Sequence, residues 1–467
     1  MRERFYLDVT ARHDEVTGTC IPCIEYIGNK VFSFMVDFGC FQEKKYLSLN
    51  NSFGFDPRQI GDVLLTHTHM DHMGRIPFLV KKGFNNKIYL THDASVLIEP
   101  ALQDAVKIER NNAFKEGRDI LYIDCDVTRT MEILNPCGFE KSIWINDYTR
   151  VTFLQNGHLP GAACIFVEVI YGNRSINLFF TGDYNNKSPF FKVNPIPDWI
   201  LKKRVTIVTE STYGDKEEKD IVKCFEKNVL DAVNRGKTII VPVFSLGRSQ
   251  ELLLYIKGMQ QRGVLEKSVP IYLDGKLAIK YTDIFNSGKL EIYKDMPKFL
   301  PDNFTFVDRD LRTHLLNNKS RKIILTTSGM AGYGPAITYL LRYVSDPNAL
   351  IHFTGYCAEG TLGRQLKEAN KGDDVLVAGV LKSKHADCFY TEEFSAHTKS
   401  EGLVDLFNQF NDVGLVLVNH GQHDNKLALC KKVEPLPHVK DVGILGRENT
   451  YRIGEWGLEK SYPTRFI

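Results

Sequence analysis

Residues 64–74 of this 467-residue chain read LLTHTHMDHMG, and the run HTHMDH places three histidines and one aspartate within six positions. A buried imidazole or carboxylate is costly unless it has a partner, so a cluster this dense is either fully solvated or bound to a cation. The apolar run DVLL precedes the cluster, and a helix-like face follows it at Ile76, Phe78, Leu79 and Val80. The cluster therefore lies at a junction between a strand and a helix, which favours the cation.

Other short apolar runs also lead into a histidine, an aspartate or a glutamate. Six such positions stand out, namely Asp37, His67, His158, Asp183, Glu210 and His420. Strands whose carboxyl ends present ligands can build a site from distant parts of a sequence, so we expect these residues at one shared edge of a sheet. Imidazole and carboxylate groups suit zinc. The HTHMDH run and the later strand ends together offer enough ligands for two ions, which need about six protein groups.

Composition and charge narrow the functional classes. The net charge is only +2, so no global basic field indicates nucleic-acid binding. No stretch approaches the roughly 20 apolar residues that span a membrane, and the amino-terminal MRERFYLDVTARHDE lacks the apolar centre of a signal peptide. We therefore expect no membrane partner and a cytoplasmic location, or a nuclear one in a eukaryote. The single CxxC pair, Cys20 and Cys23, favours buried free thiols over a zinc ribbon.

The middle of the chain follows a different pattern. Between about residues 211 and 390, a strand, a glycine turn and a helix repeat, as in GKTIIVPVF followed by GRSQELLLYI and KIILTTSGM followed by PAITYLLRYV. This alternation predicts a parallel α/β domain. The later runs FSAHTKSEGLVDLF and LVLVNHG return to the first pattern. We therefore predict a domain of residues 1–209 and 391–467, interrupted by a second domain of residues 210–390.

Taken together, these motifs resemble a known family. HTHMDH with Asp37, His158 and Asp183 resembles the metallo-β-lactamase superfamily. TESTYG, FSAHT and NHG resemble its β-CASP branch of RNA-processing nucleases, of the bacterial, archaeal and cleavage-and-polyadenylation types. EVTGTC, GRSQELL, TSGM and EGTLGR extend the resemblance over nearly the whole chain. It implies an α/β fold, in which an αββα metallo-β-lactamase sandwich carries an inserted parallel α/β β-CASP domain.

The resemblance also implies two Zn²⁺ ions and a role for each site residue. One zinc ion would be held by His67, His69 and His158, and the other by Asp71, His72 and His420. Asp183 would bridge both ions, and Asp37 would orient the HTHMDH loop through a hydrogen bond. His397 would be the general acid, with Glu210 fixing its tautomer. Two zinc ions would supply hydroxide near neutral pH, and a histidine beside a carboxylate can protonate the departing sugar oxygen.

These features predict a zinc-dependent ribonuclease that hydrolyses phosphodiester bonds of single-stranded RNA in RNA processing or decay. An endonuclease is expected, with additional exonuclease action left open. His420 favours RNA, because DNA-processing members of the branch generally lack a histidine in this last motif. Two alternatives are a nuclease that acts on DNA and a non-catalytic scaffold subunit of an RNA-processing complex. The complete set of expected ligands argues against the scaffold, and the sequence does not decide between a homodimer and a larger complex.

The glycine turns of the middle domain have two interpretations. Backbone N–H groups at the start of a helix can cradle a phosphate, but glycine also occurs where a chain simply turns tightly. On the first interpretation, RNA phosphates would contact Arg248, Ser328, Gly329, Thr361 and Arg364.

Overall fold

The computed structural model describes residues 3–188, 191, 193–221, 223–291, 299–355, 357 and 359–464. It divides into two compact units, of which unit 1 comprises residues 1–218 and 396–467 and unit 2 comprises residues 219–395. The boundaries predicted from the sequence, after residues 209 and 390, lie earlier than the boundaries of these units. As a result Glu210, predicted as the first residue of the inserted domain, belongs to unit 1. Within the described ranges, no helix has both the length and the apolar character needed to cross a membrane.

One sheet of unit 1 has eight strands in the order β23-β22-β1-β2-β3-β4-β5-β6. Strands β1 to β3 are antiparallel, and β3 to β6 are parallel. The strands are β1 (Phe5–Thr10), β2 (Ile21–Ile27), β3 (Lys30–Val36), β4 (Asp62–Leu64), β5 (Ile88–Thr91), β6 (Leu134–Cys137), β22 (Asn449–Gly454) and β23 (Gly457–Pro463). The helical segments between them are η1 (Lys44–Asn51), η2 (Pro57–Gln59), α1 (Met70–Met73), α2 (Ile76–Lys81), α3 (His92–Glu116) and α4 (Asp124–Glu132).

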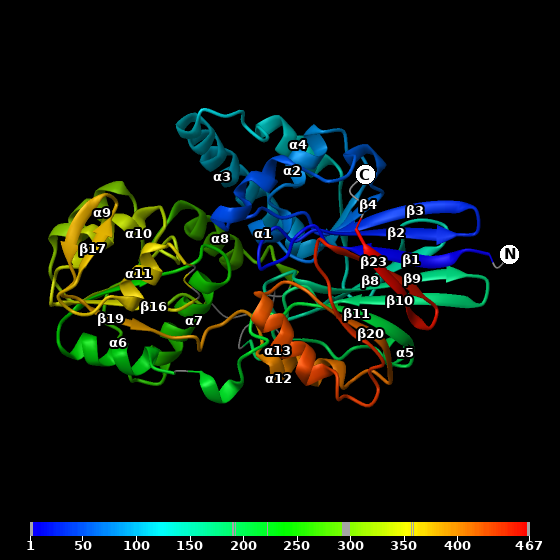
Figure 1. Ribbon diagram of the computed structural model, residues 1–467. Coiled ribbons are helices and arrows are strands. Elements are labelled where there is room, and N and C mark those ends of the chain that lie inside the picture. The colour runs from blue at the N-terminus through cyan, green and yellow to red at the C-terminus, as the bar shows by residue number, and fades with distance from the viewer. Residues whose placement is uncertain are drawn as a thin grey trace. The chain divides into compact units, whose positions relative to one another are not determined.

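The second sheet of unit 1 has seven strands in the order β21-β20-β11-β10-β9-β8-β7. Its strands are β7 (Ser142–Trp144), β8 (Thr149–Gln155), β9 (Ala163–Tyr171), β10 (Arg174–Phe180), β11 (Arg204–Thr209), β20 (Asp412–Val418) and β21 (Val442–Ile444). The helices are α5 (Asp198–Leu201), α12 (Ser400–Phe407) and α13 (His423–Val433), while η3 (Glu218–Asp220) spans the boundary of the units. In Figure 1 the two sheets of unit 1 lie face to face.

The prediction of one shared sheet edge is wrong. Asp37 and His67 follow strands of the eight-stranded sheet, whereas His158, Asp183, Glu210 and His420 follow strands of the seven-stranded sheet. The alternation of apolar residues shows that each run is a strand but does not say which strands pair, because pairing depends on partners distant in the sequence.

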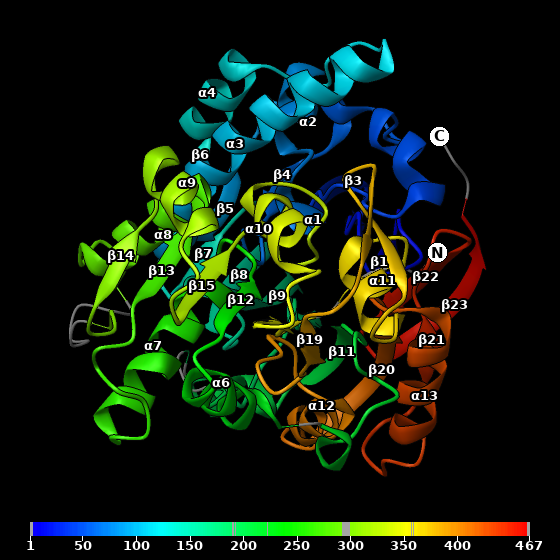
Figure 2. The same cartoon turned by 90° about the vertical axis from the view of Figure 1, so that its left-hand side faces the viewer.

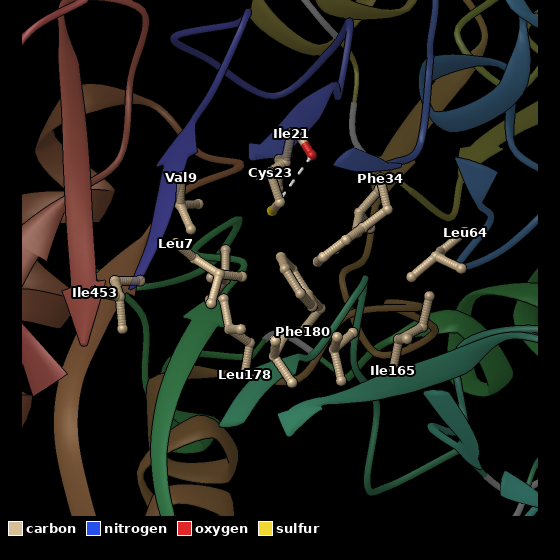
Figure 3. Close-up of a cluster of buried hydrophobic side chains, with 14 of the residues drawn as sticks. Leu7, Val9, Ile21, Cys23, Phe34, Leu64, Ile165, Leu178, Phe180 and Ile453 are labelled. Carbon is tan, nitrogen blue, oxygen red and sulfur yellow. Dashed lines mark hydrogen bonds between the residues drawn. The ribbon is translucent and has the colours of Figure 1, made fainter. Parts of the chain in front are cut away.

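The core between the two sheets is apolar. Leu7, Val9 and Phe34 from one sheet point toward Leu178 and Phe180 from the other (Figure 3). Leu7 and Val9 share a face because side chains two residues apart in a strand lie on the same side. The ten cysteines are free, as expected from the sequence, and Cys23 packs in this core. Burial raises the pKa of Cys20 to about 12, so that thiol stays protonated.

Unit 2 contains a parallel sheet in the order β14-β13-β15-β12-β16-β19. The first four of these strands, β14, β13, β15 and β12, can be followed in that order in Figure 2. The predicted repeats of strand, glycine turn and helix are confirmed. The strands are β12 (Thr238–Pro242), β13 (Ile271–Asp274), β14 (Phe304–Phe306), β15 (Lys322–Thr326), β16 (Ala349–Phe353) and β19 (Asp387–Tyr390), with a hairpin of β17 (Asp374–Val377) and β18 (Val380–Ser383). The helices are α6 (Phe225–Asn234), α7 (Arg248–Gln261), α8 (Lys276–Asn286), α9 (Arg309–Asn317), α10 (Pro335–Tyr343) and α11 (Leu362–Glu368).

Candidate metal centre

The first group of side chains that could hold a metal ion consists of His67, His69, His158 and Asp183, whose candidate ligand atoms lie within 4.8 Å of one another. The first two residues lie between β4 and α1, His158 follows β8 and Asp183 follows β10. His158 Nε2 is 3.1 Å from His69 Nδ1, and Asp183 Oδ2 is 3.4 Å from His67 Nε2. Three loops from distant parts of the sequence thus converge on one point.

The second group consists of Asp71, His72 and His420. His72 Nε2 lies 3.2 Å from His420 Nε2 and 3.3 Å from Asp183 Oδ1. Asp71 Oδ2 is 3.7 Å from His420 Nε2. Asp183 therefore faces the first group with Oδ2 and the second group with Oδ1, which is the position expected of a shared ligand.

These residues fit a metal pair. Two buried atoms among them, His67 Nε2 and Asp183 Oδ1, have no hydrogen-bond partner within the described chain. In addition, pairs of imidazole nitrogens face one another at 3.1 and 3.2 Å. Buried polar atoms left without partners are costly, and a bound cation would satisfy them. Imidazole nitrogens with carboxylate oxygens are a donor set that zinc accepts.

The pKa values of most of these histidines favour the neutral ring. Burial lowers the pKa of His69 to about 4, and it holds the pKa values of His67 and His158 well below their ordinary range. A neutral imidazole keeps a lone pair that a cation can use. His72 differs, because the carboxylates of Asp183 and Asp37 outweigh its burial and raise its pKa well above the ordinary value.

Asp37 lies beside these ligands without belonging to either group. Its carboxylate accepts hydrogen bonds from the backbone N–H of Thr66 at 2.8 Å and from the Thr66 hydroxyl at 2.7 Å. The ring nitrogen Nδ1 of His72 lies 2.7 Å from Oδ2 of Asp37, the same oxygen that accepts the Thr66 hydroxyl. Because Nδ1 donates to this carboxylate, Nε2 of His72 is left to face the other members of the second group, Asp71 and His420.

His397 and Glu210 form a third group together with Asp183. His397 Nδ1 is 2.8 Å from Glu210 Oε2, while His397 Nε2 is 3.8 Å from Asp183 Oδ2. The other Glu210 oxygen accepts the backbone N–H of Tyr184 at 2.5 Å, so the carboxylate is fixed. Burial of the His397 ring lowers its pKa, but the negative charges of Glu210 and Asp183 outweigh this effect and raise the pKa to about 9.

Asn156 is a site residue that the sequence reasoning missed. It lies just after β8 and is fully buried. Its Oδ1 accepts the backbone N–H of His158 at 3.2 Å, and its Nδ2 donates to the carbonyls of Thr181 and Asp183 at 3.1 and 2.7 Å. This side chain connects two ligand loops. In the sequence, an asparagine before a glycine signals only a turn, so no pattern identifies this role.

Arg75 is a second residue that the sequence reasoning missed. Its guanidinium is buried against the Phe38 ring, 4.2 Å from the ring centre. It donates to the carbonyls of Gly39 at 2.6 Å, Leu49 at 2.9 Å and Ser52 at 3.0 Å. Arg75 thereby fixes the segment after β3 to the end of α1.

The residues predicted to contact RNA phosphates lie in unit 2. Arg248 begins α7, where its guanidinium pairs with Glu251 at 3.0 Å and donates to a backbone carbonyl at the end of β16. Ser328 and Gly329 follow β15, and the Ser328 hydroxyl oxygen accepts the backbone N–H of Gly332 at 3.1 Å. Thr361 and Arg364 belong to the start of α11, where the Thr361 hydroxyl caps the helix by accepting the N–H of Arg364 at 3.3 Å.

Two family models match this chain. The Metallo-beta-lactamase superfamily model covers residues 26–151, within unit 1, and the Beta-Casp domain model covers residues 249–366, within unit 2. With the two-sheet architecture and the clustered His and Asp ligands, these matches place the chain in the metallo-β-lactamase superfamily, in the branch that carries a β-CASP domain.

Three relatives illustrate which proteins this chain is similar to. Transcription termination factor FttA from Methanosarcina mazei is 32% identical over 68% of this chain and 50% of its own length. Ribonuclease TTHA0252 from Thermus thermophilus is 27% identical over 85% of this chain and 89% of its own length. RNase aCSPSF2 from Saccharolobus solfataricus is 29% identical over 92% of this chain and 82% of its own length. The chain thus spans about half the length of the first relative and more than four fifths of the other two.

Proposed function

We propose that this protein is a zinc-dependent ribonuclease that hydrolyses phosphodiester bonds of single-stranded RNA by metal-activated hydroxide, in RNA processing or decay. The observation that carries the proposal is the pair of donor groups that share Asp183, with His397 and Glu210 beside the same carboxylate. The names of two relatives, ribonuclease and RNase, support the same class of reaction.

We assign one zinc ion to His67, His69 and His158 and a second to Asp71, His72 and His420, with Asp183 shared. Bound zinc would supply the hydroxide and would neutralise the charge of a phosphate. The chain itself positions the ligands, because Asp37 holds the Nδ1 side of His72 and leaves Nε2 toward the site.

His397 is assigned as the general acid. Its Nδ1 is engaged by Glu210, so the proton available for transfer sits on Nε2, on the side of the ring that faces Asp183. The departing sugar oxygen is a poor leaving group until it is protonated. Glu210 acts on this step by fixing the tautomer of His397, and the N–H of Tyr184 in turn fixes Glu210.

RNA is favoured over DNA because the last motif retains His420. We assign the glycine turns of unit 2, with Ser328, Gly329 and Thr361, to contacts with the phosphates of the RNA backbone. Arg248 and Arg364 are assigned to the negative charge of the same phosphates. Salt dependence tests this assignment, since each phosphate contact adds to the slope of affinity against salt. Arg248→Ala should flatten that slope, and an unchanged slope would remove Arg248 from the assignment.

Cleavage of end-labelled strands tests the proposed activity. Single-stranded RNA and its DNA counterpart, labelled at the 5′ or the 3′ end, are incubated with zinc-loaded wild type, Asp183→Ala and His397→Ala, and the products are sized on a denaturing gel. Wild type should cut RNA, and Asp183→Ala should not. His397→Ala should lose roughly 10²–10⁴-fold in rate, which is the usual contribution of a general acid.

Each outcome distinguishes among the candidate functions. Products of many lengths indicate internal cuts, whereas single nucleotides released from one end indicate trimming. Equal cleavage of DNA would contradict the preference for RNA. A protein that holds two zinc ions and cuts neither strand would favour a scaffold subunit.

A further inference from the structure

Phe244 has an unusual environment at the carboxyl end of β12. One edge of its ring, Cδ2 and Cε2, packs against two glycines, Gly329 after β15 and Gly355 after β16. A Cβ atom at Gly329 would lie 2.9 Å from this edge, and one at Gly355 would lie 3.3 Å from it. The ring nevertheless remains 37% exposed. Two glycines, at the ends of the strands on either side of β12, thus make room for an aromatic ring that stays open to solvent.

The backbone of Phe244 is fixed. Its carbonyl accepts hydrogen bonds from the Ser249 hydroxyl at 2.6 Å and from the Ser249 N–H at 3.3 Å. The Arg248 guanidinium is close by, because its Nη1 would lie 3.6 Å from a Cβ atom at Gly355. The backbone that carries the ring is therefore held in place, and the nearby Arg248 guanidinium is itself paired with Glu251. An isolated exposed phenylalanine would carry little meaning, but one anchored in this way is preorganised.

The topology of unit 2 places this ring where parallel sheets bind ligands. Strands β12 and β16 are neighbours in the sheet order. The chain leaves β12 toward β13 on one side and leaves β16 toward β19 on the other side. Neighbouring strands whose connections run in opposite directions leave a crevice at their carboxyl ends, which is the usual ligand position in such sheets. Phe244 and Gly355 come from these two strand ends.

We propose that Phe244 is a stacking platform for an unpaired nucleobase of the substrate strand. Every base has a flat π face, so one aromatic ring can bind bases without reading their sequence. A base inside a duplex has both faces covered by its neighbours, so this platform would select for single strands. The inference deepens the proposed ribonuclease function and rests on it for the identity of the strand.

Binding measured without cleavage tests the platform. The zinc-loaded His397→Ala protein serves as the background, so that the strand stays intact during the titration. Affinity is measured by fluorescence anisotropy for a short unstructured RNA and for an abasic sugar-phosphate strand of equal length. Phe244→Leu should weaken RNA binding about tenfold and leave binding of the abasic strand within twofold, because only the base contact is lost. Phe244→Tyr keeps the ring and should bind RNA like the background protein.

Two further variants serve as controls. Gly355→Ala would place a Cβ atom 3.3 Å from the ring edge and shift the ring without removing it, so it should weaken RNA binding in the same direction as Phe244→Leu. Phe389→Leu removes another exposed ring of unit 2, on the outer strand β19 and 44% exposed, and should leave RNA binding unchanged. Circular dichroism and thermal unfolding establish that each variant is folded.

Two results would overturn the platform. One is RNA binding by Phe244→Leu at the background affinity, and the other is an equal loss for RNA and the abasic strand, which would mean that Phe244 only shapes the phosphate loop. A cleavage assay with protein that retains His397 distinguishes a failure of the platform from a failure of the proposed ribonuclease function. If Phe244→Leu binds RNA normally while the wild type still cuts RNA, only the platform fails. If the wild type neither binds nor cuts RNA, both fail.

Discussion

A single uncharged residue, Asn156, holds two ligand loops of the metal centre in register. Its amide bonds the backbone of His158 on one side and the backbone carbonyls of Thr181 and Asp183 on the other. We predict that Asn156→Asp, which keeps the acceptor and loses both donors, lowers zinc affinity roughly 10–100-fold, as changes to groups that orient ligands typically do. Competition with a coloured chelator measures the affinity directly.

A matched variant separates this effect from a general loss of stability. Asn177 is another buried asparagine of unit 1, and its Nδ2 donates to the carbonyl of Arg204 at 2.9 Å, away from the metal ligands. Asn177→Ala should cost about 1 kcal/mol of unfolding free energy, as the loss of one internal hydrogen bond typically does, with zinc affinity unchanged. Wild-type zinc affinity in Asn156→Asp would show that the loops are held by other contacts.

At the scale of elements, the segment that follows β3 lies directly on α1. The N–H of Phe38 donates to the carbonyl of His72 at 2.7 Å, and the N–H of Cys40 donates to that of Met70 at 2.8 Å. A Cβ atom at Gly39 would lie only 1.6 Å from the carbonyl oxygen of Asp71. We predict that Gly39→Ala forces α1 away from this segment and reduces bound zinc to less than half of the wild-type content. Metal analysis of the purified variant measures this loss.

Gly138→Ala is the control for this prediction. It lies in unit 1, and its new Cβ atom would meet only the flexible Lys141 side chain at 3.3 Å. It should therefore retain full zinc content. A Gly39→Ala protein with normal zinc content would mean that α1 can shift without moving Asp71 and His72.

The elements were predictable from the sequence to the extent that their signals are local. Each apolar run before Asp37, His158 and His420 forms a strand, because alternation and length are properties of the run itself. The structure also brings the predicted ligands together in the predicted groups. The division of the strands between two sheets was not predictable, because pairing depends on distant partners. Asn156 and Arg75 were missed for the same reason, since their hydrogen-bond partners are backbone atoms that only the folded chain brings near.

At the scale of the whole molecule, a buried carboxylate between the two sheets of unit 1 should make the free energy of unfolding depend on pH. Glu25 on β2 is buried, and it accepts hydrogen bonds from the Thr149 hydroxyl at 2.7 Å and the Asn146 amide at 3.2 Å, both from the other side of the sandwich. Burial raises its pKa to about 7, against the opposing effect of these two hydrogen bonds. The folded protein therefore binds this proton more tightly than the unfolded chain, whose glutamate has a pKa of 4.5.

The sign of the pH dependence follows from that difference. The stabilising contribution is fully present below pH 4.5 and is lost as the pH rises through 7, with an upper bound of about 3 kcal/mol. Glu25→Gln cannot ionise, so its unfolding free energy relative to wild type should rise between pH 5 and pH 8. Urea unfolding at the two pH values measures the change. Asp147→Asn removes the same charge from an exposed position and should give a constant difference. If Glu25→Gln also gave a constant difference, Glu25 would ionise equally well in the folded and unfolded protein, and the coupling of the sandwich to pH would have to come from other groups.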